Sequence, residues 1–96
     1  MAKILVSDAI ADSGIQILKE KTEVTYKTDL SREEFLDIIG EFDGIIVRSM
    51  TKLNKEALNA AENLKVIGRA GTGYDNIDIE EATKRGIFVF NTPTGN

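Results

Sequence analysis

The stretch that decides the fold is GIIVRSMTKLNKEALNAAENLKVIG, residues 44–68. It opens on the apolar run IIV, closes on the apolar pair VI (66–67), and carries a segment with helical spacing between them. Short apolar runs of this kind are typical of strands that are covered on both faces of a parallel sheet. Asn54 is a suitable N-cap for the joining helix, and Leu53 with Leu58 fits the hydrophobic pair around such a cap. The stretch therefore predicts a strand–helix–strand unit.

The same alternation continues along the whole chain. Strands are predicted at residues 3–7, 23–26, 45–48, 66–68 and 87–90, with helix-like segments between them. Such alternation favours βα units and a parallel sheet. Because crossovers between parallel strands are right-handed, few topologies remain. We expect an α/β fold with a flavodoxin-like, doubly wound, five-stranded sheet of order 2-1-3-4-5.

Local signals mark where the helices begin and end. Ser31 with Glu34 predicts a capping box, and Leu30 with Phe35 fits its hydrophobic staple. Another helix is predicted to begin at Asp78, with Glu81 in its first turn, and to end at Gly86. The first helix has the weakest pattern, since Gly14 interrupts its apolar face and costs about 1 kcal/mol relative to alanine. That face consists of Ile10, Gly14, Ile17 and Leu18.

Composition bounds the possible chemistry. The chain has 96 residues, which suits one small domain. Its net charge of −4 argues against a nucleic-acid-binding surface. It has no cysteine and no histidine, so disulfides, thiol chemistry and the usual zinc ligands are excluded. We therefore expect no metal site, and the commonest general base near neutral pH is missing from the chain. The apolar run at residues 4–6 is too short for a signal-peptide core, so a cytoplasmic location is the default expectation.

In open α/β sheets, ligands bind beyond the carboxyl ends of the strands. The predicted strand ends are Asp8, Thr28-Asp29, Arg48-Ser49, Gly71-Thr72-Gly73 and residues 91–96. A phosphoacceptor site would need paired acids after the first strand and another acid after the third. Here the first strand is followed by the single acid Asp8, and the third by Arg48, which has the opposite charge.

The Gly71-Thr72-Gly73 stretch resembles a nucleotide-binding turn but lacks its pattern. A dinucleotide fingerprint needs a third glycine at position 76, where the chain has Asn76, and it follows the first strand rather than the fourth. The two glycines can simply allow a tight corner. Alternatively, their backbone N–H groups form an anion-binding nest beside Arg48, whose planar guanidinium suits a carboxylate or phosphate. Arg48 can also be a charged strand end that reaches solvent, and both interpretations stay open on the pattern alone.

Three motifs carry a resemblance to a known family. IVRS (46–49), GRAGTGYDNID (68–78) and NTPTGN (91–96) resemble the N-terminal part of the D-2-hydroxyacid dehydrogenases, and the resemblance covers the whole chain. Members of that family have a flavodoxin-like substrate domain and an inserted Rossmann domain that binds NAD. The resemblance implies that residues 1–96 are a truncated substrate-binding domain without its closing helix, and that the Rossmann domain, the GxGxxG turn and the catalytic Arg, Glu and His lie outside it.

The resemblance also implies roles for individual residues. Arg48 and Ser49 resemble residues that meet a phosphorylated hydroxyacid, a 3-phosphoglycerate-like small molecule. Gly71 and Gly73 resemble the loop whose backbone holds the substrate carboxylate, and Thr72 a contact toward the nicotinamide of NAD. Asn96 resembles a substrate-binding asparagine at the domain crossover. Met50 and Tyr74 depart from the smaller residues expected at their positions.

Two hypotheses of different classes follow. In the first, the chain is the substrate-binding wall of an NAD-dependent dehydrogenase and is inactive alone. In the second, it is an autonomous flavodoxin-like folding unit or a self-associating scaffold without ligand function. Apolar surface left exposed near the last strand favours a homo-oligomer in that case.

Overall fold

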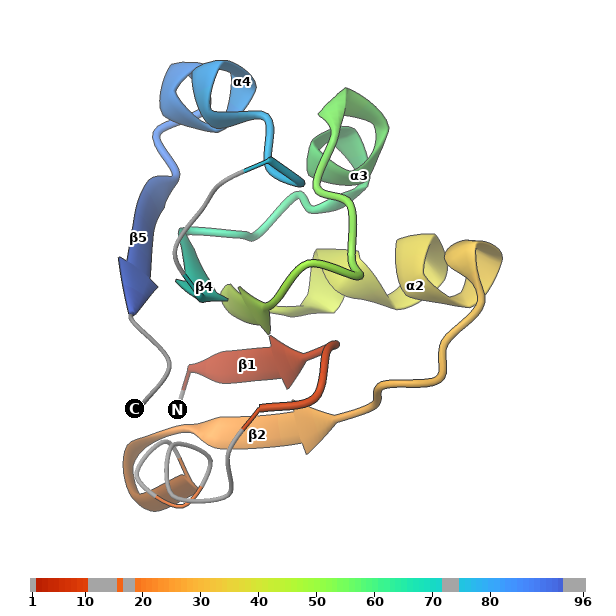
Figure 1. Ribbon diagram of the computed structural model, residues 1–96, viewed down its shortest axis with the longest axis vertical. Coiled ribbons are helices and arrows are strands. Elements are labelled where there is room, and N and C mark those ends of the chain that lie inside the picture. Colours follow the sequence, from red (N-terminus) through yellow and green to blue (C-terminus); the bar gives the residue numbers. More distant parts are fainter. Residues whose placement is uncertain (1, 11–15, 17–18, 72–74, 93–96) are drawn as a thin grey trace.

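The computed structural model of the chain describes residues 2–10, 16, 19–71 and 75–92. Five strands form one parallel sheet in the order β2-β1-β3-β4-β5 (Figure 1). The strands are β1 (Lys3–Val6), β2 (Glu23–Tyr26), β3 (Gly44–Val47), β4 (Val66–Ala70) and β5 (Phe88–Thr92). The predicted doubly wound α/β sheet and its strand order are thus confirmed. Strand bounds differ from the predicted ones by at most two residues, as strand ends usually do.

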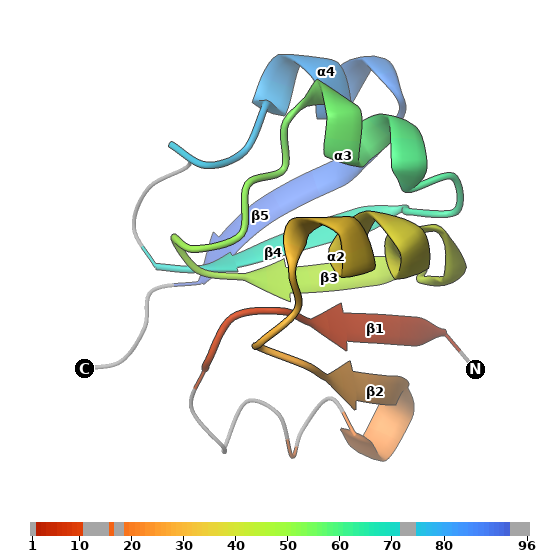
Figure 2. The ribbon, with the colours of Figure 1, turned by 90° about the vertical axis from the view of Figure 1, so that its right-hand side faces the viewer.

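Three helices pack on one face of this sheet (Figure 2). They are α2 (Arg32–Ile38), α3 (Lys55–Ala60) and α4 (Ile79–Lys84), and the 3-10 turn η1 (Ile39–Glu41) extends α2. The crossover between β1 and β2 is described only in part: residues 16 and 19–21 are helical. Most of the predicted first helix, including Gly14, Ile17 and Leu18, lies outside the described residues.

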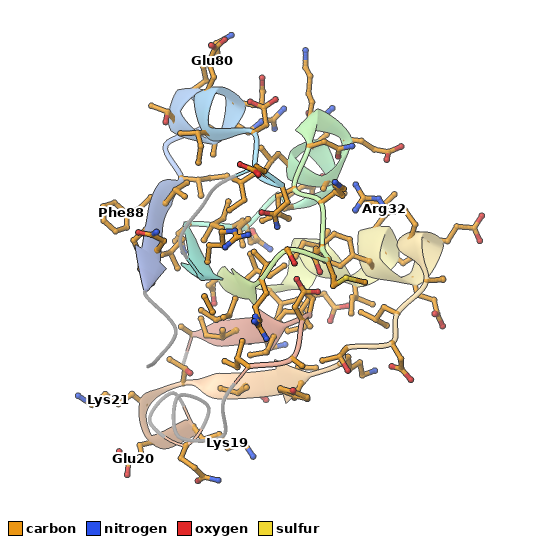
Figure 3. All side chains as sticks on the ribbon, in the orientation of Figure 1. Lys19, Glu20, Lys21, Arg32, Glu80 and Phe88 are labelled. Atoms are coloured by element: carbon orange, nitrogen blue, oxygen red, sulfur yellow. The ribbon has the colours of Figure 1, made fainter. Side chains whose placement is uncertain are left out.

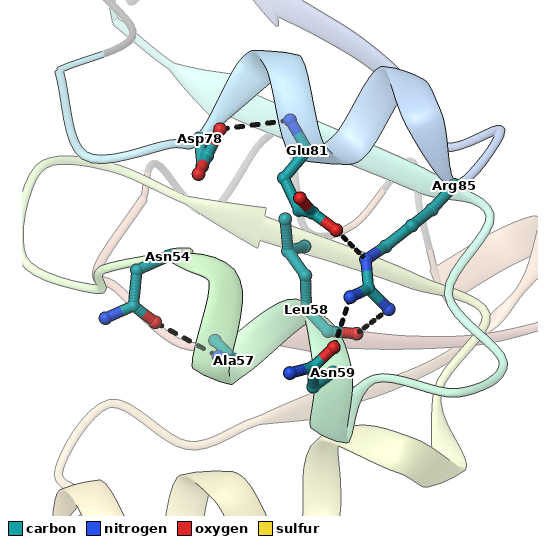
Figure 4. Close-up of polar contacts among 7 residues, drawn as sticks. All are labelled: Asn54, Ala57, Leu58, Asn59, Asp78, Glu81 and Arg85. Atoms are coloured by element: carbon teal, nitrogen blue, oxygen red, sulfur yellow. Dashed lines mark hydrogen bonds and ion pairs between the residues drawn. The ribbon is translucent and has the colours of Figure 1, made fainter.

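The predicted helix caps are confirmed. Ser31 Oγ accepts a hydrogen bond from the Glu34 backbone N–H (3.2 Å), and Glu34 Oε1 accepts one from the Ser31 N–H (2.9 Å), which completes the capping box. Asn54 and Asp78 cap α3 and α4 by accepting from the residue three positions on (Figure 4). These bonds satisfy backbone donors that have no partner inside a helix.

One continuous core lies between the helices and the sheet. A row of neighbouring residues, Leu5, Ile45 and Ile67, crosses the centre of the sheet and is completely buried. The rest of this core comes mainly from the helices and the segments around them: Phe35, Ile39, Phe42, Val47, Leu53, Ala57, Leu58, Ala61, Leu64, Ile77, Ala82 and Ile87. Full burial of a leucine, isoleucine, valine or phenylalanine side chain contributes about 1.5–3 kcal/mol, so this layer stabilises the fold strongly.

The other face of the sheet is apolar as well. Next to Gly44 lie the side chains of Ile4 and Val66, and a β-carbon on Gly44 would come within 2.8 Å of both. Gly68 is covered in the same way by Ile46 and Phe90. Phe88, on the edge strand β5, is 66% exposed and points away from the helices (Figure 3).

Candidate functional site

The predicted site residues that the structure describes lie where β3 and β4 end. Arg48 and Ser49 directly follow β3, and Gly71 directly follows the neighbouring strand β4. Arg48 and Ser49 are exposed, and the Arg48 guanidinium makes only a long hydrogen bond, 3.4 Å, to the Ala9 carbonyl among the described residues. The structure thus brings three of the six predicted residues to adjacent strand ends. Thr72, Gly73 and Asn96 lie outside the described residues, as do Tyr74 and Pro93.

A short segment, Arg48 to Thr51, forms the rim of this site. We call it the 48–51 segment. Two buried side chains from other parts of the chain hold its backbone: Asp8, which follows β1, and Asn76, which precedes α4. Ser49 and Met50, in the middle of the segment, make no hydrogen bond to any residue that the structure describes, and Met50 is 81% exposed. The ends of the segment are therefore fixed while its middle faces solvent.

Arg69 is a second cationic residue at this edge. It lies in β4, and its Nε donates a 3.0 Å hydrogen bond to Asn76 Oδ1. Its guanidinium also lies against Gly71, in the space that a side chain at position 71 would need. Gly71 also has a φ of +150°, a backbone conformation that disfavours residues other than glycine. The Gly71 carbonyl accepts a 3.1 Å bond from Asn91 Nδ2, at the end of β5.

Sequence reasoning missed Arg69, Asn76 and the role of Asp8. One signal for Arg69 was available, since it is the only charged residue in the strand VIGRA. In the sequence, Asn76 stands out only because it interrupts a glycine fingerprint, and Asp8 only as an acid without a second acid beside it. Their partners lie far away in the sequence, so no local pattern reports them.

A cleft of about 380 Å³ lies beside the 48–51 segment, next to α2. Asp8, Met50 and Thr51 form its wall toward the site. Arg48, Ser49 and Gly71 do not line this cleft, whose cationic residues are Arg32 and Lys52. Arg32 is bonded to Lys52 O and Asn54 Oδ1 and lies over the Phe35 ring. The described residues of the predicted anion site therefore lie outside the cleft, at the ends of β3 and β4.

Within the described ranges, no three acidic, histidine or cysteine residues are grouped so that they could hold a metal ion. Among the helices that the structure describes, none is long and apolar enough to cross a membrane.

Comparison with protein families gives one match that spans nearly the whole chain. Residues 4–96 match the family described as D-isomer specific 2-hydroxyacid dehydrogenase, catalytic domain. The D-3-phosphoglycerate dehydrogenase of Synechocystis sp. is 52% identical over 96 residues, covering 100% of this chain but 17% of the relative. The enzyme of the same name from Archaeoglobus fulgidus is 48% identical, with 98% and 18% covered. The chain thus spans less than a fifth of these relatives.

Solved structures agree with the fold. The PH0520 protein of Pyrococcus horikoshii superposes with a TM-score of 0.90 at 44% identity, covering 96% of this chain and 28% of that one. The 3-phosphoglycerate dehydrogenase of Entamoeba histolytica, solved with NAD+ bound, gives a TM-score of 0.81 at 37% identity, with 96% and 33% covered.

Proposed function

Because the chain belongs to the D-isomer specific 2-hydroxyacid dehydrogenase family, we propose that it forms the substrate-binding wall of an NAD-dependent phosphoglycerate dehydrogenase. The proposed reaction is oxidation of the 2-hydroxyl of 3-phospho-D-glycerate by hydride transfer to NAD, in cytoplasmic serine biosynthesis. The curated relatives named above support this substrate. The observation that carries the proposal is the convergence of Arg48, Gly71 and Arg69 at adjacent strand ends.

The proposed substrate carries a phosphate and a carboxylate, and this edge offers groups for both. The guanidinium groups of Arg48 and Arg69 suit anions because each presents a planar set of N–H donors. Ser49 adds a hydroxyl that has no described partner. We assign the backbone N–H groups of Gly71 and Gly73 to the carboxylate, and Asn96 to a further substrate contact.

The described residues do not fit a whole NAD molecule. A dinucleotide site needs a glycine-rich turn after the first strand, opening a helix. Here β1 is followed by Ser7 and the buried acid Asp8, whose charge would repel a pyrophosphate. We therefore assign NAD binding to a separate Rossmann domain, and only one nicotinamide-side contact, Thr72, to this chain.

A titration of the chain with 3-phosphoglycerate, followed by amide NMR, tests the substrate assignment. We expect shifts at Arg48, Ser49 and Gly71, weaker shifts with glycerate, and about tenfold weaker binding for Arg48→Ala. Lys19→Ala serves as the control: it removes the same charge from an exposed residue before β2, whereas the site lies over β3 and β4. Equal losses of affinity in the two variants would mean that the ligand is attracted by overall charge and not by Arg48 specifically.

We also propose that the 96-residue chain alone has no dehydrogenase activity. It has no histidine to accept the proton and no nucleotide-binding turn. Formation of NADH from 3-phosphoglycerate and NAD by the pure chain, above the rate of an Arg48→Ala control, would contradict this.

One observation favours the second candidate function, a self-associating folding unit. Phe88 is 66% exposed on the edge strand β5, beside Phe90 at a ring distance of 6.0 Å. An edge strand with exposed aromatic residues is a surface on which a second copy can pair. Light scattering should then show dimers that Phe88→Lys removes and that Tyr26→Lys, on the other edge strand, leaves intact. A wild-type chain that is monomeric at high concentration would exclude this candidate.

A further inference from the structure

All the buried polar side chains in the described part of the chain converge on one place. They are Ser7, Asp8 and Asn76, each less than 8% exposed. Burying a polar or charged group is unfavourable unless hydrogen bonds replace its water contacts. Each of the three is hydrogen-bonded to the 48–51 segment: Ser7 Oγ to Thr51 Oγ1 (2.8 Å), and Asp8 and Asn76 to the backbone. Among the described residues, every buried polar side chain thus contacts this segment.

The bonds form a clamp on both ends of the segment. Asp8 Oδ2 accepts from the backbone N–H of Arg48 (2.7 Å) and from that of Thr51 (2.9 Å). Asn76 Nδ2 donates to the carbonyl of Arg48 (2.5 Å) and to that of Thr51 (2.7 Å). The carboxylate therefore holds both N–H groups and the amide holds both carbonyl groups. A third bond, from Thr51 Oγ1 to Asp8 Oδ1 (2.7 Å), strengthens the carboxylate side.

Asn76 connects the clamp to the second arginine. While its Nδ2 holds the segment, its Oδ1 accepts the 3.0 Å bond from Arg69 Nε. Its own backbone is anchored, because the Asn76 carbonyl accepts a 2.7 Å bond from Leu53 N, just before α3. One side-chain amide thus fixes the backbone at Arg48 and the guanidinium of Arg69 together.

We propose that Asp8 and Asn76 are positioning residues, which hold Arg48, Ser49 and Arg69 in the arrangement that binds an anionic substrate before the substrate arrives. This inference rests on the proposed function of the site. Preorganisation improves affinity because the ligand does not have to order the groups that bind it. Neither residue needs to contact the substrate for this effect.

Simple electrostatics and the clamp make opposite predictions for Asp8→Ala. Removing a carboxylate beside an anion site should strengthen anion binding if charge alone matters. If the clamp matters, the loss of its bonds to Arg48 and Thr51 should weaken binding of 3-phosphoglycerate by about tenfold. Asp8→Asn removes the charge but keeps an oxygen that can accept from both N–H groups, so it should bind as well as the wild type or better.

The experiment measures the dissociation constant of 3-phosphoglycerate by isothermal titration, at a temperature where each variant is folded by circular dichroism. Asp8→Ala and Asn76→Ala are expected to lose affinity, and Asp8→Asn to retain it. Asn63→Ala is the matched control: Asn63 Nδ2 also donates to a backbone carbonyl, that of Gly40, but away from the site. Unchanged or tighter binding by Asp8→Ala would overturn the proposal.

A second measurement separates this inference from the proposed function. Hydrogen exchange at the Arg48 and Thr51 amides should be slow in the wild type and fast in Asp8→Ala, while the buried Ile45 amide stays protected. If the wild-type chain does not bind 3-phosphoglycerate, the proposed function fails for this chain, and exchange alone decides whether the clamp exists. Fast exchange at these two amides in the wild type would overturn the clamp, whatever binds.

Discussion

The guanidinium of Arg69 lies in the space that a β-carbon on Gly71 would enter. Gly71, which follows β4, is thus packed against the cationic side chain of β4. Position 71 therefore favours glycine for two reasons: its positive φ and the lack of space for a side chain.

Gly71→Ala should therefore affect both stability and ligand binding. We expect a loss of about 1–3 kcal/mol in the free energy of unfolding, because an alanine at this φ is strained. We also expect weaker binding of 3-phosphoglycerate, because Arg69 is displaced. Urea unfolding and a binding titration measure the two effects.

Gly86→Ala provides the control for Gly71→Ala. Gly86 also has a positive φ, +76°, but a β-carbon there would meet nothing within 4 Å. It should cost about 1 kcal/mol of stability without changing affinity. If Gly71→Ala behaved in the same way, the contact with Arg69 would have no role in binding.

Arg85 joins α4 to α3, and its removal should loosen that contact. Its Nε donates to Glu81 Oε2 at 2.8 Å, and its other nitrogens donate to the Leu58 carbonyl and to Asn59 Oδ1 (Figure 4). Arg85→Met keeps much of the aliphatic volume but loses these bonds, so we expect a loss of about 1–2 kcal/mol in urea unfolding. Lys84→Met, at an exposed neighbour, should change stability little. Equal losses in both variants would assign the effect to charge alone.

The close approach around Gly44 predicts a rescue experiment. Gly44→Ala would place a β-carbon 2.7 Å from Ile4 Cδ1 and 2.8 Å from Val66 Cγ1, and should cost about 1–3 kcal/mol through overpacking. Val66→Ala makes space next to it. In thermal unfolding, the double variant should therefore be more stable than the sum of the single effects predicts, by at least about 0.5 kcal/mol. Strictly additive losses would show that the added methyl group does not clash with Val66.

Two carboxylates should contribute to acid unfolding. The Ser31 backbone N–H, and then the Ser31 hydroxyl, lower the pKa of Glu34 from its ordinary value of 4.5. The Lys3 backbone N–H lowers the pKa of Asp43 from 3.8, with help from Lys65. A carboxyl whose pKa is lower in the folded state stabilises the fold above its unfolded pKa, and this stabilisation is lost as the pH falls through the folded pKa.

Glu34→Gln combined with Asp43→Asn keeps the hydrogen-bond acceptors but removes both titrations. The unfolding free energy of this double variant should fall less between about pH 5 and pH 3 than that of the wild type. Denaturant unfolding at several pH values measures the slopes. Parallel slopes would mean that other groups dominate acid unfolding.

Sequence patterns were sufficient to predict the fold because its determinants are local. The IIV and VI runs, the Ser31 capping box and the Asn54 cap each act within a few residues, and right-handed crossovers then leave few strand orders. The strand-end rule also located Arg48, Ser49 and Gly71. The clamp could not be predicted in this way, because it depends on how Asp8 and Asn76 meet a segment distant in sequence.

The all-parallel sheet has a consequence for how the chain acquires its structure. All the strand pairs that the structure describes are parallel, so even the first pair, Lys3 with Glu23, is connected by a whole crossover rather than a tight turn. β1 pairs with both β2 and β3, so its second partner lies beyond a further crossover in the chain. Contacts of such high sequence separation slow folding, to milliseconds or longer by the general trend. Before β2 and β3 pair with it, the apolar run at residues 4–6 lacks both partner strands, and an unpaired apolar strand of this kind is prone to aggregate.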